Sequence, residues 1–394
     1  MTSTIRTSSA AHLLAALPHQ TGFHPRESLV LVPFSGNESC GLLRIDLPRS
    51  SELEATAATA IGSVCRLPEA DGIVTVVYTD GPARDGAGVT HETLVAAVAE
   101  RAEACGLAVR GELCVASDAW CAYDDAVPRP LEDIAEADPR PDADIDPSQE
   151  SGTALPEADP GLRLDIAREL EEYTRTGEAV ARLTRDAAHG HPHISGSADI
   201  DTACALDIAA FETAPIAFFE SALDGPRPLS AAYAAQWLWI LQTPALRDVA
   251  LTQWAGGAAE AEEALAWQTR WHAGDSEEPD GPLRLGGEGS RPSAVRLETA
   301  RRFARTLAAH APQSHLGPCL AACAWLSWAL GSSTHADAYA RRALEVDPPL
   351  GLALLVRALV GEGTLPGWAY DPVGSDASHA PARDVAKRRA RDAA

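Results

Sequence analysis

The chain has 394 residues, of which 46% are hydrophobic and 22% charged, so it is long enough for two or three domains and too apolar for wholesale disorder. It carries 32 Lys and Arg against 56 Asp and Glu, a formal net charge of -24. Nucleic acids and anionic membrane surfaces attract clustered positive charge, so this balance argues against both as partners.

The N-terminal 20 residues lack the charged start and the continuous apolar core of a secretory signal, and no window approaches the ~20 consecutive apolar residues of a membrane span. The eight cysteines are scattered and form no Cys-x-x-Cys pair, which argues against a zinc ribbon or a thioredoxin-type motif. Cys319 and Cys323 lie one helical turn apart, a spacing that suits a metal but is better explained by buried packing. We therefore expect a reduced, cytoplasmic protein without a metal site or cofactor.

The first 120 residues alternate between strand and helix patterns. Helical patterns cover 9–17, 51–66 and 90–105, and apolar runs typical of strands cover 28–34, 41–47, 73–79 and 113–117, the last perhaps beginning near 107. The segment 35–38 (SGNE) is rich in turn-forming residues and predicts a hairpin between the first two strands. The order strand, helix, strand from 73 to 117 predicts a βαβ crossover. The sequence thus predicts an α/β domain at 1–125, with a mixed sheet flanked by helices.

The composition changes abruptly at 131–160, which holds ten acidic residues, one basic residue and five prolines. Such a segment buries too little apolar surface to offset the entropy of ordering. We expect an acidic, proline-rich linker or insertion at 126–160; a docking segment for a basic partner is the alternative.

Helical patterns dominate after residue 160, and eight of the nine tryptophans follow residue 236. Aromatic residues at this density are typical of packing between helices. We therefore expect an all-α domain at 161–372. The polar segment 373–394 is expected to be a disordered tail.

One helical hairpin has the spacing of a tetratricopeptide (TPR) unit, whose repeat is ~34 residues long. The matching positions are Leu320, Ala324, Ala336, Ala340, Ala343 and Pro348. Small residues allow two antiparallel helices to approach closely, and a proline ends the second helix. Because a stable array needs about three repeats, one match predicts only a TPR-like hairpin.

Two patterns in the chain could form chemical sites. His189, His191 and His193 alternate and could converge on a metal, but the neighbouring Gly and Pro favour an exposed loop. The segment 81–88 (GPARDGAG) lies between a strand and a helix, where phosphate binds in many folds, yet it matches neither the Walker pattern nor Gly-x-Gly-x-x-Gly. No Gly-x-Ser-x-Gly elbow and no His-Glu-x-x-His helix is present, so no catalytic residue is assigned.

Asp46, Asp80 and Asp118 fall near the predicted carboxyl ends of strands, where α/β folds place ligand crevices. Acidic residues there are also ordinary turn formers and helix caps.

The most specific motif of the chain is Gly22-Phe23-His24-Pro25 with Ser28, preceded by LLAALP at 13–18. Further motifs are the strand ending in VYTD at 77–80, the segment from Leu113 to Trp120, the Arg247-Asp248 pair and ARRAL at 340–344. Together these motifs resemble an actinobacterial family known as domain of unknown function 4192. The resemblance implies an architecture over about residues 8–368 but no activity. Cys121 stands where many relatives have a Cys-Cys-Pro-like stretch.

The candidate ligand-binding residues are His24, Ser28, Asp46, Asp80, Asp118 and Trp120. For the block from Gly22 to Pro25 a structural role is favoured, because Gly permits a tight turn and Pro fixes φ. The alternative is that His24 and Ser28 face a ligand.

These observations favour a non-catalytic binding or scaffold protein that acts through its helical domain on another protein. The alternative is an enzyme, or a module that binds a nucleotide or another small molecule, with its site at the strand ends of the N-terminal domain.

Overall fold

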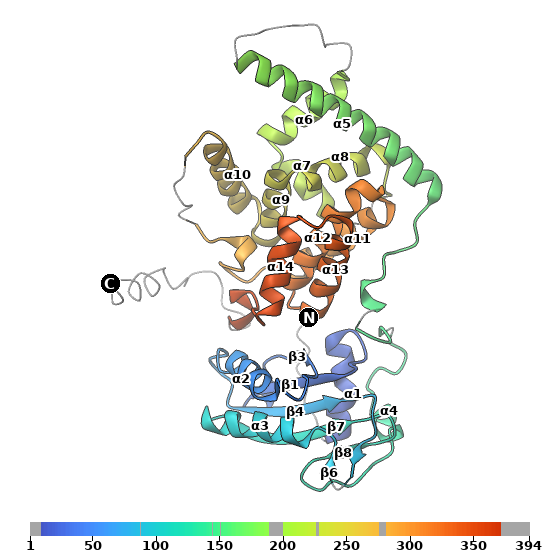
Figure 1. Ribbon diagram of the computed structural model, residues 1–394, viewed down its shortest axis with the longest axis vertical. Coiled ribbons are helices and arrows are strands. Elements are labelled where there is room, and N and C mark those ends of the chain that lie inside the picture. The colour runs from blue at the N-terminus through green and yellow to red at the C-terminus, as the bar shows by residue number, and fades with distance from the viewer. Residues whose placement is uncertain are drawn as a thin grey trace, which may run out of the picture. The chain divides into compact units, whose positions relative to one another are not determined.

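The computed structural model describes residues 9–371 except 87, 144, 150, 189–199, 226–227 and 276–280. The chain divides into two compact units, Met1–Thr153 and Ala154–Ala394. The predicted fold class is confirmed, since a mixed sheet with flanking helices is followed by a helical unit (Figure 1). The alternating histidines His189, His191 and His193 and the predicted tail at 373–394 lie outside the described residues.

The N-terminal unit is built on a sheet with the strand order β2-β1-β4-β7-β8, and β3 pairs with β1 as well. The strands are β1 (Ser28–Ser35), β2 (Glu38–Ser39), β3 (Leu43–Asp46), β4 (Gly72–Tyr78), β7 (Ala108–Val115) and β8 (Trp120–Ala122). β4 and β7 are parallel and α3 (Glu92–Ala104) connects them, as the crossover pattern predicted; the other pairs are antiparallel. β5 (Arg84–Asp85) and β6 (Gly88–Val89) form a separate two-stranded sheet.

Helices cover both faces of this sheet (Figure 1). Leu29, Leu31 and Val77 face α3 and α2 (Leu53–Val64), whereas Val30 and Val76 belong to the opposite face, against α1 (Ala10–Thr21). Successive strand residues point to opposite faces, and a strand covered on both sides has no polar alternation. That explains the continuous apolar pattern of 73–79.

The helix α1 is longer than its sequence pattern predicted. Pro18 lies inside it, and the helix ends only at Gly22, which has φ 80 and donates its N–H to the carbonyl of Pro18. A proline removes one backbone donor. The buried side chains of Leu14 and Leu17 hold this segment on the sheet.

Part of the acidic segment bonds to the N-terminal unit. It contains α4 (Glu132–Glu136) and a short 3-10 turn, Ser151–Thr153. Oδ1 of Asp138 lies 2.6 Å from Nε2 of His19, and the backbone of Asp146 exchanges hydrogen bonds with Gly22 and His24. The side chain of Asp138 and the backbone of Asp146 thus attach this part of the segment to the end of α1 and the residues that follow it.

The second unit is helical. Its helices are α5 (Pro160–Ala188), α6 (Thr202–Thr213), α7 (Ile216–Glu220), α8 (Ala231–Gln242), α9 (Pro244–Gly256), α10 (Ala258–His272), α11 (Ala294–His310), α12 (Gln313–Ala329), α13 (Ser333–Val346) and α14 (Gly351–Gly361). Every residue of α12 from Gly317 to Ala329 is buried, so this helix forms the centre of the core. Cys319 and Cys323 lie on it, fully buried, in the packing role favoured from the sequence.

Helices α12 and α13 form a hairpin joined by a short turn. The start of α12 lies beside the end of α13, since a Cβ added at Gly317 would be 3.2 Å from the Cβ of Asp347. Ala336, Ala340 and Ala343 are fully buried. The sequence prediction of a small-residue stripe packed in the protein interior is therefore confirmed for this hairpin.

Replacing Ala340 with Leu should destabilise the protein by about 1–3 kcal/mol, because added methylene groups overpack a filled contact. Leucine forms helices almost as well as alanine, so helix propensity cannot cause such a loss. Urea denaturation measures the change. Arg341→Ala is the matched control, since Arg341 is exposed and its ion pair with Asp337 lies at the surface. Wild-type stability of Ala340→Leu would contradict close packing of this stripe.

Candidate functional site

Three of the predicted site residues lie in one row across the sheet. Ser28 of β1 pairs with Asp46 on one side and Tyr78 on the other, and Val115 pairs with Tyr78 and with Trp120. The row lies at the carboxyl ends of β3, β4 and β7, which all run in the same direction. The structure thus brings Asp46, Ser28 and Trp120 to one edge of the sheet, which we call the strand-end edge.

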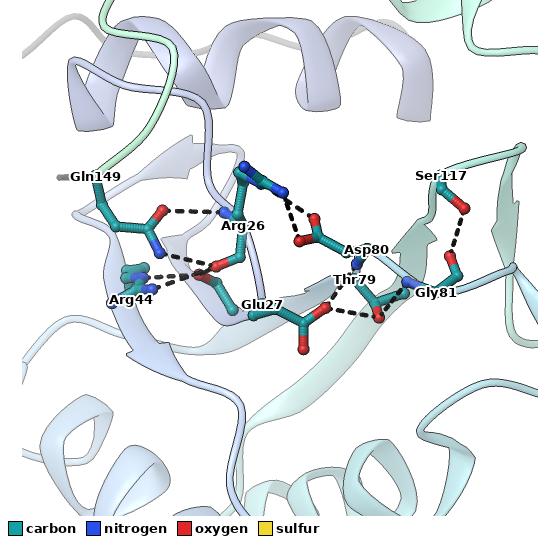
Figure 2. Close-up of polar contacts among 9 residues, drawn as sticks. Arg26, Glu27, Arg44, Thr79, Asp80, Gly81, Ser117 and Gln149 are labelled. Carbon is teal, nitrogen blue, oxygen red and sulfur yellow. Dashed lines mark hydrogen bonds and ion pairs between the residues drawn. The ribbon is translucent and has the colours of Figure 1, made fainter. Parts of the chain in front are cut away.

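The carboxylates at this edge are bonded to arginines of the same chain. Nε and Nη2 of Arg26 donate to the two oxygens of Asp80, at 3.1 and 2.6 Å (Figure 2). The hydrogen bond from Arg26 lowers the pKa of Asp80. Asp46, which is exposed, pairs with Arg44, whose Nε donates to the buried hydroxyl of Ser28 at 2.8 Å.

Glu27 fastens the start of β1 to the loop after β4. Its Oε1 accepts hydrogen bonds from the hydroxyl of Thr79 and the N–H of Asp80, at 3.1 and 2.6 Å (Figure 2). Glu27 has φ 43, a conformation that costs free energy in a residue with a side chain. Gln149 adds two hydrogen bonds to the backbone of Arg26.

The segment 81–88, a connection between a strand and a helix that matches no phosphate-binding pattern, is also bonded within the unit. Oδ1 of Asp118 accepts the N–H of Ala83 at 2.8 Å, and Ser117 donates from both its N–H and its hydroxyl to the carbonyl of Gly81. Asp118 therefore acts as a turn residue that ties the loop after β7 to the loop after β4.

Two buried polar atoms at this edge have no hydrogen-bond partner among the described residues. They are the hydroxyl of Tyr78 and Nε1 of Trp120. Burial raises the pKa of Tyr78, so its hydroxyl keeps its proton. Arg129 covers the indole of Trp120 at 4.9 Å from the ring centroid. His24 is exposed and contacts the acidic segment through its backbone N–H.

The helical unit contains an open groove. We call it the α10 groove. Its volume is about 1140 Å³. The ends of α6 and α9, together with α7, α10 and the start of α11, supply its lining. The lining includes Glu212, Ile216, Ala217, Glu220, Gln253, Glu262, Leu265, Ala266 and Arg296.

A fixed polar cluster forms part of the groove wall. Arg296 donates to both carboxylate oxygens of Glu220, at 2.5 and 3.0 Å, and lowers the pKa of that carboxyl. Nε2 of Gln253, which is fully buried, donates to Glu220 at 3.0 Å and to the carbonyl of Ile216 at 2.9 Å. These two acceptors fix the orientation of the amide, and its Oε1 has no hydrogen-bond partner in the described part of the chain.

A family model described as a domain of unknown function (DUF4192) matches residues 11–279, more than half of the chain. The chain belongs to this family. No curated protein and no solved structure shows a significant match. The DUF4192 match spans the whole sheet and all the helices that line the α10 groove except α11.

The described residues of this DUF4192 protein contain no group of three or more His, Cys, Asp or Glu side chains placed to hold a metal ion. None of the described helices is by itself both long and apolar enough to cross a membrane. Only taken together do Thr202–Thr213 and Ile216–Leu223 reach the length and apolar composition of a membrane span, and these two segments are bent by 93° relative to each other.

Sequence reasoning missed Arg26, Glu27 and Gln149 and every residue of the α10 groove. Arg26 and Asp80 are 54 residues apart, so no local spacing signals their contact. For the groove, the sequence offered only alanines on helical segments, such as Ala217 and Ala266, and the structure shows that they are exposed and line a hollow.

Proposed function

We propose that this DUF4192 protein is a non-catalytic binding protein whose helical unit holds a segment of a partner protein in the α10 groove. The observation that carries the proposal is the groove itself. Small-molecule sites usually enclose about 300–1,000 Å³ and surround their ligand. A larger, open groove between helices suits an amphipathic helix of another protein.

The lining indicates the chemistry of the partner segment. Ile216 and Leu265 are half-buried, and exposed alanines lie beside them, so the floor can take apolar side chains. Glu212 and Glu262 are exposed on the rim, and neither forms an ion pair with another described residue. The charge of Arg296 is already balanced by Glu220. The groove therefore favours a segment that combines Leu- or Ile-type residues with Arg or Lys.

The cluster of Gln253, Glu220 and Arg296 also supports binding of a partner segment in the α10 groove. Its members are held by one another, so the wall loses little conformational freedom on binding. Gln253 is fully buried, so it supports the wall from behind through its bonds to Glu220 and to the carbonyl of Ile216.

The packing of α12 against α13 adds a helical hairpin whose residue spacing resembles a TPR unit, and such hairpins commonly support partner binding. The acidic balance of the chain continues to argue against nucleic acid and anionic membranes as partners.

The strand-end edge is a weaker candidate for a ligand site. A small molecule that used Asp80 or Asp118 would have to compete with Arg26 and with the N–H of Ala83 for these carboxylates. Their present bonds shape the loops, which is a structural use of these side chains.

The experiment is selection from a displayed library of random peptides. The wild-type protein is the bait, and Ala266→Trp, which fills the groove with a large side chain, is the counter-selection. We expect enriched peptides in which Arg or Lys recurs among Leu, Ile or Phe at helical spacing. Enrichment of acidic peptides, or equal binding to Ala266→Trp, would contradict the proposal.

Isothermal titration of an enriched peptide then tests the rim. Glu212→Gln and Glu262→Gln should each weaken binding by about 2–5-fold, the range that a surface ion pair supplies. Added salt should weaken wild-type binding and affect these variants less. Glu345→Gln, a change at an exposed position on α13, is the matched control and should leave the affinity unchanged.

A further inference from the structure

A second cavity of the helical unit lies where the residues before α5 pass the turn between α11 and α12. Its volume is about 400 Å³. Residues 155–158, the first turn of α5, the end of α11 and the start of α12 supply its lining, and none of them lines the α10 groove. We call it the α12 pocket. Its size lies within the range of about 300–1,000 Å³ that is usual for small-molecule sites.

Most of the lining of the α12 pocket is apolar. Leu155 and Leu316 are half-buried, and small residues such as Ala308 and Ala311 leave room beside them. The polar side chains of the lining are those of Arg163 and Gln313. The pocket therefore suits a ligand with an apolar body and one polar group.

Arg163 is the charged residue of this lining. Its Nη2 donates to the carbonyl of Ala309 at 2.5 Å, and no carboxylate of the described residues forms an ion pair with its guanidinium. Two other arginines of α5, Arg168 and Arg175, each pair with a carboxylate on the same helix. A guanidinium has five N–H donors, so Arg163 retains donors for an anion in the pocket.

The walls of the pocket are held by hydrogen bonds between distant parts of the chain. Nη2 of Arg305 on α11 donates to the carbonyl of Ala154 at 2.5 Å. The backbone N–H of Asp159 donates to Nε2 of His310, a buried residue at the end of α11, at 3.2 Å. A ligand therefore meets a pocket that is already formed, and little conformational freedom is lost on binding.

The electrostatics of the surrounding backbone agree with a negative ligand group. Gln313 is the first residue of α12, a helix of 17 residues whose N-cap has no side-chain hydrogen bond. The positive end of its dipole adds to the attraction that Arg163 exerts on an anion. The carboxylate of Asp159 is not part of the lining; its Oδ1 accepts the N–H groups of Gly161 and Leu162 at the start of α5.

We propose that the α12 pocket binds a small carboxylic acid with an apolar body, such as a short aliphatic or an aromatic acid. The guanidinium of Arg163 pairs with the carboxylate, and the side chains of Leu155 and Leu316 contact the apolar body. Charge-assisted hydrogen bonds from arginine are about twice as strong as neutral ones, so the acid is preferred over its neutral amide. This site is separate from the α10 groove, and either proposal can fail without the other.

The test compares acids with amides that have the same apolar body. Saturation-transfer NMR on the full-length protein measures binding of hexanoate against hexanamide and of benzoate against benzamide. We expect the amides to bind at least about 10-fold more weakly, the factor that a hydrogen bond to a charged group supplies. Equal affinity for acid and amide, or no binding of either acid, would overturn the proposal.

Three variants locate the ligand. Arg163→Gln should weaken hexanoate binding by at least about 10-fold, whereas Arg168→Gln, a change at an exposed position of the same helix, should leave it unchanged. Ala158→Trp fills the pocket from its loop and should abolish binding. Thermal melts verify that the variants are folded, and Arg163→Lys replaces Arg163→Gln if the latter is not. Wild-type affinity of Ala158→Trp, or an equal loss in Arg168→Gln, would place the ligand elsewhere and refute the site.

Discussion

Replacing Arg284 by alanine is expected to destabilise the helical unit by about 3–5 kcal/mol, the usual cost of removing one partner from a buried ion pair. The side chain of Arg284 is only 2% exposed, and its guanidinium pairs with Glu260 at 2.5 Å. It also donates to the backbone carbonyl and the hydroxyl of Ser290 and lies over the ring of Trp368. Alanine would leave a carboxylate and a carbonyl without their donors.

Urea denaturation followed by circular dichroism measures this loss. Arg168→Ala is the matched control, because Arg168 pairs with Asp165 on α5 with both side chains more than half exposed, and such a pair contributes little. Arg284→Lys should recover only part of the stability, since an ammonium group cannot form the bidentate hydrogen bonds that the guanidinium makes with the carboxylate of Glu260. Equal stability of Arg284→Ala and Arg168→Ala would contradict a structural role for this ion pair.

The second large effect is expected at Trp237, where alanine should cost about 3–5 kcal/mol. The indole is fully buried at the centre of an aromatic cluster. Its ring centroid lies 5.2 Å from that of Phe218, 5.3 Å from that of Trp254 and 5.3 Å from that of Phe303. Truncation removes these contacts and leaves a cavity between α8, α9 and α11.

A paired substitution separates packing from hydrogen bonding. Nε1 of Trp237 has no hydrogen-bond partner among the described residues, whereas Nε1 of Trp254 donates to the carbonyl of Phe219 at 3.0 Å. Trp254→Phe should therefore cost more than Trp237→Phe, because it also leaves a buried carbonyl unpaired. Trp271→Ala, at a 52% exposed position, should change stability little. Denaturant melts of the four variants give the ranking, and the reverse order for the two Phe variants would contradict the hydrogen-bond argument.

Local patterns were enough to predict most of the fold. The continuous apolar run at 73–79 indicated a strand with two covered faces, and β4 is such a strand. The pattern at 90–105 indicated the crossover helix, which became α3. The short strands β5, β6 and β8 and the helix α4 were not predicted, and several helix ends were misplaced. The helical pattern at 161–176 predicts a helix that ends before Gly177, whereas α5 continues past this glycine to Ala188. The glycine faces the indole of Trp239 from inside the helix.

The candidate site was predicted by position only. Asp46, Asp80 and Asp118 do lie at one edge of the sheet, because β3, β4 and β7 share a direction. Their bonding partners were not predictable. Arg26 and Arg44 come from other segments, and a contact between distant residues leaves no periodic signal in the sequence.

The sequence by itself determined the properties that depend on neighbours along the chain: the two fold classes, the strand and helix segments, the small-residue stripe of α13 and the family motif around Gly22. The tertiary structure alone decided the properties that depend on residues brought together from a distance. These are the bonding of the strand-end carboxylates and the α10 groove between five helices. The physical reason is that apolar periodicity and the hydrogen bonds within helices and turns relate residues that are close in the sequence. A site, in contrast, is a set of side chains brought together only by the packing of whole elements.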